Sequence, residues 1–396
     1  MDKTTLKEDI LNMGDGDILL ELPTGTGKTK LALEILNCYC TGEILIVVPK
    51  LTLIKSWEQE IQKHGFDNLM PRIHFSTYIS YPKYVDDIKS GIIEYTVFDE
   101  CHHCTERVMF AYRQTECKGR HIFLSATVSQ SIKDRIREVS PMLQSYTLSV
   151  QTAIMENMLP EPTIVLFPLT LDNTSPYVTY SRGKGAEVVT CQYWERRKYM
   201  YKKGITLHIK CTEKQYIDLL ENNITFLSRF SSRSMTLNRQ YLLRLKMLSY
   251  FKTKVVKRII DDVLKDRRVL TFCTDIQQSE YLSPNCVHSK NVLHQQILDA
   301  FNAGEINQIT AVAMLDEGVN LVNCQFGIYC AISSSDRRIA QRLGRILRHK
   351  HPVLIIPFYS DTREADIVFG EMLSTTDNVI YANNMQELKN VINKIT

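Results

Sequence analysis

Residues 18–29 have the sequence ILLELPTGTGKT, in which a short apolar run leads directly into a glycine-rich loop. A helical pattern follows this loop and extends from Lys30 to Cys38. Glycines allow backbone N–H groups to approach phosphate oxygens, a lysine reaches the β- and γ-phosphates, and a threonine hydroxyl reaches Mg²⁺. The stretch therefore predicts a strand, a loop that binds a triphosphate, and a helix. The loop residues expected to bind the nucleotide are Pro23, Thr24, Gly25, Thr26, Gly27, Lys28 and Thr29.

Short apolar runs alternate with helical patterns around this loop and again in the second half of the chain. Runs of this kind suit buried parallel strands that are joined by helices. The sequence therefore predicts an α/β fold with two domains, each built on a parallel sheet flanked by helices. The runs lie at 18–22, 44–48, 73–75, 95–98 and 121–124, and then at 269–273, 309–314, 326–332 and 353–356.

A second candidate site follows the apolar run 95–98, where the chain continues with Asp99 and Glu100. A carboxylate at the end of a buried strand can hold Mg²⁺, directly or through water, and its neighbour can polarise an attacking water. We assign Asp99 to the metal together with Thr29, and Glu100 to the water. A strand that ends in Asp-Glu is also an ordinary turn, and the pair alone does not separate the two interpretations.

The segment between the two halves has a different character. Residues 151–260 contain four prolines at 160, 162, 168 and 176, a Gly-Lys-Gly at 183–185, and then long helical patterns. We interpret this region as a linker and an insertion. The expected boundaries are 1–160 for the first α/β domain, 161–265 for the linker and the insertion with its helices, 266–360 for the second α/β domain, and 361–396 for a C-terminal helical extension.

The composition is typical of a soluble globular protein, because 44% of the 396 residues are hydrophobic and 23% are charged. No stretch approaches the roughly 20 apolar residues of a membrane span, and the start MDKTTLKE is no secretory signal. We expect an intracellular, cytoplasmic protein, with a nuclear or viral context left open. Residues 177–268 contain 21 Lys and Arg against 8 Asp and Glu. This asymmetry indicates a polyanionic partner, although a solvated helical surface has the same pattern.

The 11 cysteines are scattered and odd in number, which favours a reducing compartment. Residues 101–104 read CHHC and are possible zinc ligands. A structural zinc site needs four ligands, however, and no second Cys or His pair follows at the spacing of a zinc finger. We therefore expect no zinc at this segment.

Five motifs in order make the chain resemble the superfamily 2 helicases. They are PTGTGKT at 23–29, DECH at 99–102, SAT at 125–127, DEGVNL at 316–321 and QRLGRILR at 341–348. The resemblance covers residues 19–348. It implies two tandem RecA-like domains with the basic segment inserted between them, ATP and Mg²⁺ as cofactors, and a nucleic-acid-stimulated ATPase. The forms DECH and DEGVNL are most similar to the branch that holds XPB-type and phage DNA helicases and the motors of type I and III restriction enzymes.

The resemblance also implies roles for single residues. It assigns catalysis to Lys28, Asp99, Glu100, Gln341, Arg345 and Arg348, and further ATP contacts to Gly318 and Asn320. It assigns coupling between motifs to His102, Ser125 and Thr127, and nucleic-acid contacts to Pro49, Lys50, Thr77 and His288. Two assignments have a plain structural alternative: arginines at a spacing of three fit a solvated helix face, and a lone histidine fits a loop residue with satisfied hydrogen bonds.

Some residues depart from the family pattern. Leu22 stands where phosphate-binding loops commonly have a small residue, so only the narrower form PTGTGKT remains. The family usually has an adenine-reading glutamine upstream of the loop, whereas the first glutamine here is Gln59. Asn320 replaces a common aspartate. The sequence therefore predicts contacts with the triphosphate but supplies no residue that reads the adenine base.

Residues 177–203 mix aromatic and basic side chains, among them Trp194, Arg196 and Arg197. Bases stack on aromatic rings and phosphates pair with cations, so these three residues are candidate nucleic-acid contacts. A β-hairpin that packs its aromatic side chains on a domain would have the same composition.

These observations lead us to expect an ATP-dependent DNA helicase or translocase. It would act as a monomer, with nucleic acid as its partner, DNA rather than RNA, and no membrane. Two alternatives stay open, an RNA helicase and a nucleotide-switched sensor or scaffold that clamps a duplex without unwinding it. The short flanks of the motifs would fit a compact viral or phage motor.

Overall fold

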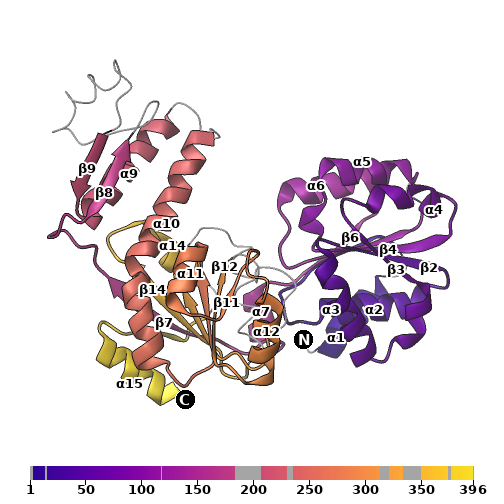
Figure 1. Ribbon diagram of the computed structural model, residues 1–396. Helices are drawn as coiled ribbons and strands as arrows, with labels where there is room; N and C mark the ends of the chain where they lie inside the picture. The colour runs from indigo at the N-terminus through magenta and orange to yellow at the C-terminus, as the bar shows by residue number, and fades with distance from the viewer. Residues whose placement is uncertain are drawn as a thin grey trace. The chain divides into compact units, whose positions relative to one another are not determined.

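The computed structural model describes most of the chain, namely residues 3–13, 16–116, 118–182, 207–229, 235–312, 321–332, 349–372 and 376–395. These residues form two compact units (Figure 1). The first contains residues up to 162 and the short described segments 321–325 and 349–352. The second contains the described residues of 163–314, 326–334 and 353–396. Among all of them, no helix is both long and apolar enough to cross a membrane.

The first unit is built on a parallel sheet with the strand order β3-β2-β4-β5-β1-β6. Every apolar run expected in this half forms one of its strands. The last strand, β6, was not expected, because its sequence QSYT has no apolar run and its side chains are mostly exposed at the sheet edge. The strands are β1 (Ile18–Glu21), β2 (Glu43–Val48), β3 (Ile73–Thr77), β4 (Ile93–Asp99), β5 (Arg120–Ser125) and β6 (Gln144–Thr147).

Helices cover both faces of this sheet. Figure 1 shows α1, α2 and α3 on one face and α4, α5 and α6 on the other. On the second face, Phe98 of β4 stacks on Phe123 of β5 with ring centroids 5.0 Å apart, and Tyr112 of α5 packs against them. The helices are α1 (Lys3–Asn12), α2 (Lys28–Tyr39), α3 (Ile54–Lys63), α4 (Val85–Lys89), α5 (Glu106–Gln114), α6 (Gln130–Val139) and α7 (Val150–Met155).

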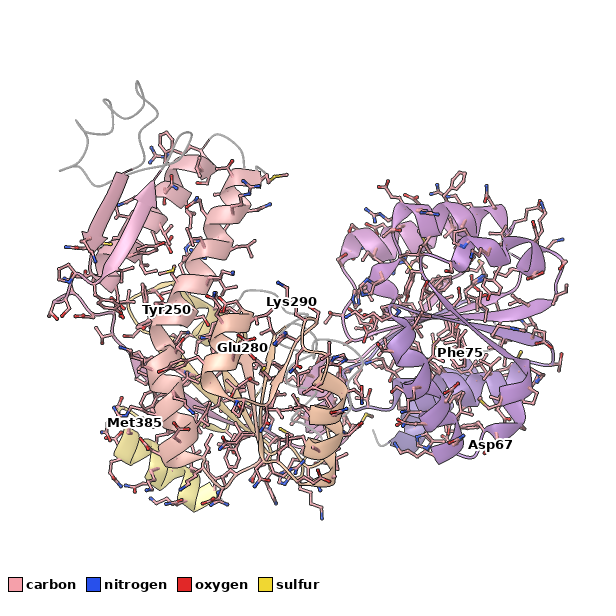
Figure 2. All side chains as sticks on the ribbon, in the orientation of Figure 1. Asp67, Phe75, Tyr250, Glu280, Lys290 and Met385 are labelled. Carbon is pink, nitrogen blue, oxygen red and sulfur yellow. The ribbon has the colours of Figure 1, made fainter. Side chains whose placement is uncertain are left out.

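The second unit is built on another parallel sheet, with the order β11-β12-β10-β13-β14-β7-β15. Its helices include α11 (Ile276–Leu282), α12 (His294–Ala303), α14 (Arg363–Ile367), a π-helical turn η8 (Val368–Met372) and α15 (Met385–Ile395), and Figure 2 labels Met385 at the start of α15. The strands are β7 (Thr163–Leu169), β10 (Val269–Cys273), β11 (Cys286–Val287), β12 (Gln308–Val312), β13 (Phe326–Tyr329), β14 (Val353–Tyr359) and β15 (Val379–Tyr381).

Two strands of this sheet come from segments for which the sequence predicted no strand. β7 begins the segment 161–265, which we expected to be linker and insertion, and it pairs with β14 along its whole length. β15 lies within 361–396, which we expected to be helical, and it pairs with Ile164–Leu166 of β7. Pro168 obscured the first of these strands, because a proline in an apolar run argues against a central strand. The structure accommodates Pro168 beyond the end of β15, where β7 has only β14 beside it.

The rest of the central segment forms a small extension of the second unit. β8 (Val178–Arg182) and β9 (Leu207–Cys211) pair as antiparallel strands, followed by α9 (Glu213–Ser228) and the long α10 (Met235–Arg258). A capping box between Thr212 and Gln215 starts α9. The two helices and the hairpin bury a core of their own that includes Tyr216, Leu220, Leu248 and Phe251. Figure 2 labels the exposed Tyr250 on α10.

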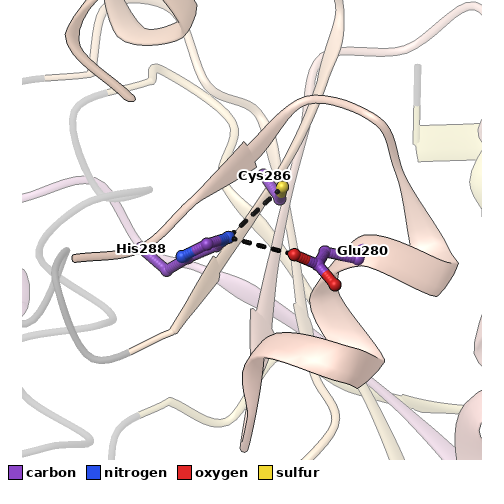
Figure 3. Close-up of side chains that lie close together, drawn as sticks. All are labelled: Glu280, Cys286 and His288. Carbon is purple, nitrogen blue, oxygen red and sulfur yellow. Dashed lines mark hydrogen bonds and ion pairs between the residues drawn. The ribbon is translucent and has the colours of Figure 1, made fainter. Parts of the chain in front are cut away.

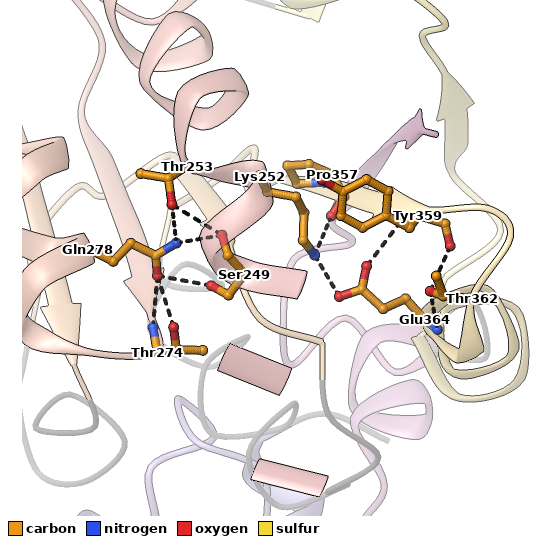
Figure 4. Close-up of polar contacts among 9 residues, drawn as sticks. All are labelled: Ser249, Lys252, Thr253, Thr274, Gln278, Pro357, Tyr359, Thr362 and Glu364. Carbon is orange, nitrogen blue, oxygen red and sulfur yellow. Dashed lines mark hydrogen bonds and ion pairs between the residues drawn. The ribbon is translucent and has the colours of Figure 1, made fainter. Parts of the chain in front are cut away.

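Buried polar groups fix α10 to the second unit (Figure 4). Lys252 is fully buried and donates from Nζ to the Glu364 carboxylate at 2.7 Å and to the Pro357 carbonyl at 3.1 Å. The other oxygen of Glu364 accepts from the Tyr359 backbone N–H at 3.0 Å. Two charges removed from water are tolerated here because each has a charged partner and further hydrogen bonds.

A second buried group, Gln278 of α11, links the same helix to the sheet. Its amide nitrogen donates to the Ser249 carbonyl at 2.8 Å and to Thr253 Oγ1 at 3.0 Å. Its amide oxygen accepts from Ser249 Oγ at 2.9 Å and from the Thr274 backbone N–H at 3.0 Å. Because this side chain is satisfied by partners on α10 and at the end of β10, it holds the extension in a defined orientation on the second sheet.

Candidate ATPase site

The carboxyl ends of three neighbouring strands meet at one edge of the first sheet. β5 lies between β1 and β4, with Glu21 of β1 opposite Ser125 and Asp99 of β4 opposite Leu124. In an open parallel sheet, ligands bind at the carboxyl ends of the strands, where the following loops leave the sheet. The glycine-rich loop, the acid pair and the SAT segment therefore all leave the sheet at the same edge.

The glycine-rich loop has a backbone that requires glycine at two positions. Gly25 and Gly27 both have a φ of 96°, which is the left-handed region. A side chain at Gly25 would also approach Leu159 Cδ2 to 3.1 Å. Gly27 precedes the first turn of α2 and offers no side-chain cap, so the first N–H groups of this helix keep the arrangement that suits a bound anion.

Two side chains of the loop make internal contacts. Lys28 donates from Nζ to the Leu22 carbonyl at 2.9 Å, and Thr26 Oγ1 donates to the Pro23 carbonyl at 2.8 Å. These bonds fold the loop back on the end of β1. Lys28 and Thr29 are both half-buried at the start of α2, in the positions from which a lysine and a threonine contact phosphate and metal in loops of this kind.

The acid pair begins at the last residue of β4. Asp99 Oδ2 accepts a hydrogen bond from Trp57 Nε1 at 2.9 Å, and its backbone carbonyl accepts one from the Tyr78 hydroxyl at 2.7 Å. Glu100 has φ 53° and ψ 57°, a left-handed conformation that is uncommon for a residue other than glycine. Such strain is typical of functional sites, where the surroundings hold a side chain in a position it would not otherwise take.

The surroundings of Asp99 disfavour the charged form of its carboxylate. Burial and the neighbouring charge of Glu100 raise the pKa of Asp99 to about 6, against the Trp57 hydrogen bond and the charge of Lys28, which lower it. A divalent cation between these oxygens would reverse the balance, because it favours both carboxylates in their charged form. The oxygens of Asp99 and Thr29 are also the kind of ligand that Mg²⁺ prefers.

The residues assigned to coupling lie beside the acid pair. His102 Nδ1 is 3.3 Å from Glu100 Oε2 and 3.2 Å from Ser125 Oγ. Ser125 Oγ is 3.4 Å from Glu100 Oε2 and donates to the Thr127 carbonyl at 2.9 Å. The hydroxyl of Thr127 is buried and has no hydrogen-bond partner among the described residues. One chain of contacts thus joins the end of β4 to the loop after β5.

Two contributors to this edge were not singled out in the sequence. Trp57 of α3 is buried and reaches Asp99 from 42 positions away. Glu21, the last residue of β1, accepts from the Val128 backbone N–H at 2.7 Å and from Lys133 Nζ at 2.5 Å. Glu21 therefore holds the loop after β5 against the strand that precedes the glycine-rich loop. An acid inside an otherwise apolar strand was the sequence signal that could have identified it.

The residues expected to contact nucleic acid differ in where they lie and in how exposed they are. Pro49 and Lys50 follow β2, and Thr77 ends β3 opposite Val48, so all three lie at the carboxyl edge of the first sheet. His288 belongs to the second unit, and its side chain is only 5% exposed, which leaves little surface for a strand. The other assigned residues lie outside the described part of the chain: Trp194, Arg196, Arg197, Gly318, Asn320, Gln341, Arg345 and Arg348.

A glycine-rich loop beside an acid pair, in a chain with two parallel α/β units, is the arrangement of an ATPase with tandem RecA-like domains. Residues 3–130 match the family described as the res subunit of type III restriction enzymes, and residues 251–350 match the helicase conserved C-terminal domain. The chain therefore carries the ATPase domains of a superfamily 2 helicase, and its family is one of ATP-dependent nucleic-acid motors.

Known proteins resemble the chain over most of its length. The DNA 3'-5' translocase XPB2 of Sulfurisphaera tokodaii is 24% identical over 353 residues, which are 84% of this chain and 75% of the relative. Dbp5 of S. cerevisiae bound to RNA and ADP BeF3 is 9% identical with a TM-score of 0.61, covering 98% of this chain and 92% of that one. Mss116p bound to ssRNA and AMP-PNP is 10% identical with a TM-score of 0.55, covering 98% and 75%. These structural likenesses show the fold alone, and none of the matches supports a viral origin.

Proposed function

We propose that the protein is an ATP-dependent DNA translocase or helicase whose ATPase site lies at the carboxyl edge of the first sheet. The observation that carries this proposal is the convergence there of the glycine-rich loop, the Asp99–Glu100 pair and the His102–Ser125 contact. The translocase relative, which is similar along most of both chains, supports DNA over RNA as the polymer. The two RNA-bound structures resemble this chain in fold only and leave that preference unchanged.

The residues at this edge divide the work of phosphoryl transfer. The loop 23–29 would hold the triphosphate through its backbone N–H groups and Lys28, while Thr29 and Asp99 would hold Mg²⁺. When bound, Mg²⁺ supplies positive charge that neutralises the phosphate oxygens. Glu100, fixed next to Asp99 by a strained backbone, would orient the attacking water and accept its proton. Gln341, Arg345 and Arg348 remain proposed catalytic residues, and Gly318 and Asn320 remain proposed ATP contacts.

The contact chain from Glu100 through His102 and Ser125 to Thr127 is a route by which the nucleotide state could reach the neighbouring loop. Each member is within 3.4 Å of the next, so a shift of Glu100 on hydrolysis must be matched by Ser125 or His102. Lys50, exposed after β2 at the same edge, would bind a phosphate of the nucleic acid, with Pro49 and Thr77 beside it. Movement would follow when ATP binding and hydrolysis alternate the grip on the strand.

The decisive test is steady-state ATPase activity with single-stranded DNA, duplex DNA and RNA of equal length, at one fixed salt concentration. We expect either form of DNA to raise kcat well above the value without polymer, and RNA to do so weakly. Stimulation by RNA alone would replace this proposal with an RNA helicase. A variant with Lys50→Ala should need more DNA for half-maximal stimulation while its basal kcat is unchanged, because the loss is one phosphate contact.

Two displacement assays separate the modes of action. Release of a third strand from a triplex without separation of a duplex identifies a translocase, and strand separation identifies a helicase. ATP-dependent retention on DNA with neither activity would identify a switch that clamps a duplex, which contradicts the proposal.

A further inference from the structure

Three side chains with metal-binding atoms converge in the second unit, at positions outside the five sequence motifs, although the family resemblance assigned His288 to nucleic acid. Glu280 lies on α11, Cys286 is the first residue of β11, and His288 follows the end of β11 (Figure 3). The segment from α11 through β11 to the turn before α12 brings all three together. Figure 2 shows Glu280 on α11 and Lys290 in the turn after β11.

The spacing of the three ligand atoms fits a tetrahedral metal ion. His288 Nε2 is 3.6 Å from Cys286 Sγ and 3.7 Å from Glu280 Oε1, and all three atoms lie within 4.8 Å of one another. Zinc bond lengths of about 2.0–2.3 Å at tetrahedral angles place ligand atoms roughly 3.3–3.7 Å apart. Glu280 is exposed, so its carboxylate is free to close the remaining distance to the sulfur.

His288 is buried beside the other two side chains and directs Nε2 toward both of them. Its side chain is 5% exposed, and Nδ1 is buried without a hydrogen-bond partner among the described residues. Among the described residues, Nε2 contacts the sulfur at 3.6 Å, within hydrogen-bond range for sulfur, and the carboxylate at 3.7 Å, which is too long for an ordinary N–H···O bond. Nε2 is therefore the nitrogen that a metal ion in this cluster would use.

The turn after β11 is held in the geometry that such a site needs. Asn291 donates from Nδ2 to the Cys286 carbonyl at 2.6 Å and approaches Cys286 Sγ at 3.8 Å, while its backbone N–H donates to the His288 carbonyl at 3.0 Å. Hydrogen bonds of this kind, made by residues next to the ligands, orient metal ligands in known sites.

We propose that Glu280, Cys286 and His288 bind one zinc ion, with a fourth position open to water. The mixed set of sulfur, nitrogen and oxygen ligands excludes Mg²⁺ and Ca²⁺, which take oxygen ligands, and suits Zn²⁺. The ion fixes α11 to the turn that leads from β11 into α12. Its role is structural, and it does not depend on the ATPase site proposed above.

The test uses the full chain, stripped with a chelator under reducing conditions and then loaded with Zn²⁺ or with Co²⁺ as a spectroscopic substitute. Elemental analysis after removal of free metal should find one zinc more in the wild type than in Cys286→Ser. The cobalt protein should show a thiolate charge-transfer band that is lost in Cys286→Ser and altered in Glu280→Gln. Glu280 is exposed, so Glu280→Gln keeps the fold, and we expect its zinc affinity to fall by at least about tenfold.

Matched controls separate this site from the other thiols and imidazoles. Cys38→Ser removes an exposed thiol in the first unit, and His294→Gln removes a nearby imidazole that contacts the Asn291 carbonyl instead. Both should bind zinc as the wild type does. Zinc should also raise the Tm of the wild type and of both controls, but not that of Cys286→Ser, because the ion binds only the folded protein.

Two results would overturn the proposal. One is equal zinc content and equal cobalt spectra in the wild type, Cys286→Ser and Glu280→Gln. The other is a stripped wild type that folds, as judged by circular dichroism, and takes up no zinc at all. Neither result bears on the ATPase activity, which is measured separately.

Discussion

The two units hold buried charge in opposite ways. At the edge of the first sheet, Asp99 and Glu100 place two carboxylates side by side, and the pKa of Asp99 is raised to about 6 by burial and by its neighbour. In the second unit, the carboxylate of Glu364 has a lysine at 2.7 Å and a backbone N–H at 3.0 Å. We call Asp99–Glu100 the unbalanced pair, because the pKa of Asp99 stays raised despite the charge of Lys28, and Lys252–Glu364 the balanced pair, because its cation contacts the carboxylate directly. Charge that is left unbalanced indicates a binding site, whereas balanced charge indicates a structural contact.

The largest expected effect comes from breaking the unbalanced pair. Glu100→Gln should lower the nucleic-acid-stimulated kcat by about 10²–10⁴-fold, the usual size of a lost general base. Thermal stability should stay equal or rise, because the substitution removes one of two like charges. Steady-state ATPase assays and thermal melts measure the two quantities. Glu106→Gln, an exposed residue of α5, should change neither, and robust hydrolysis by Glu100→Gln would show that another residue accepts the proton.

Breaking the balanced pair should have the opposite outcome. Lys252→Met leaves Glu364 buried without its cation and should lower the free energy of unfolding by about 3–5 kcal/mol, while the folded fraction keeps its ATPase activity. Denaturant unfolding followed by circular dichroism measures the loss. Lys257→Met on the same helix removes a more exposed pair with Asp261 and should cost at most about 1 kcal/mol. Adding Glu364→Leu to Lys252→Met should restore most of the stability, and no recovery would argue against the pair as the cause.

Asp17, just before β1, extends the comparison to the first unit, because it is a partly buried acid there whose charge is stabilised by its neighbours. Burial opposes its charge, but the hydrogen bond and charge of His121 and the hydrogen bonds of Ser140 and Tyr112 lower the pKa of Asp17 to about 2. Asp17→Asn should therefore lower the free energy of unfolding at neutral pH by about 2 kcal/mol.

The sign of the pH dependence follows from the lowered pKa of Asp17. Its contribution to stability is complete above the unfolded pKa, near 4, and is lost as the pH falls toward 2. The difference in unfolding free energy between the wild type and Asp17→Asn should thus shrink over this range. A difference that is constant from pH 7 to pH 2 would contradict the assignment. The control is Asp266→Asn, at an exposed position, whose curve should follow the wild type.

The smallest effect concerns the support of the unbalanced pair. Trp57→Phe keeps a six-membered aromatic ring but removes the pyrrole ring with the N–H that donates to Asp99, a hydrogen bond worth about 1 kcal/mol, or about fivefold in an equilibrium constant. Because this bond lowers the pKa of Asp99, its loss should raise the Mg²⁺ concentration needed for half-maximal ATPase activity and move the acid limb of the activity to higher pH. Unchanged Mg²⁺ dependence with a lower Tm would mean that Trp57 only packs. Leu53→Val, a substitution at a buried position just before α3, is the control for lost packing without a lost hydrogen bond.

The sequence predicted those parts of the protein that local patterns encode. The patterns on either side of the glycine-rich loop form β1 and α2, and the apolar run before Asp99 forms β4. These elements could be predicted because the spacing of their apolar residues and the residue types of the loop are both visible within a short stretch of sequence. The ATPase and helicase family followed from motif order. The roles of single site residues stay predictions, although Glu100, His102 and Ser125 do lie in contact.

Features that depend on distant partners could not be predicted in the same way. The bond from Trp57 to Asp99 joins residues 42 positions apart, and the pair of Lys252 and Glu364 joins residues 112 apart. No periodicity in a single sequence records such pairings. β6 and β15 were missed for another reason: both are short edge strands, β6 with the mostly exposed sequence QSYT and β15 with only the three residues VIY, and neither has an apolar run long enough to identify a strand.

The position of β7 has a consequence for how the protein is made. On the ribosome, this strand emerges before the whole extension and before its partners β14 and β15 have been synthesised. Its apolar residues Ile164–Phe167 must therefore wait, unpaired, while the hairpin and the long helices form. Pairing between segments so far apart is slow, and an unpaired apolar strand is prone to aggregate. Until β14 has been made, β7 is thus a segment of the newly made chain that is exposed to aggregation.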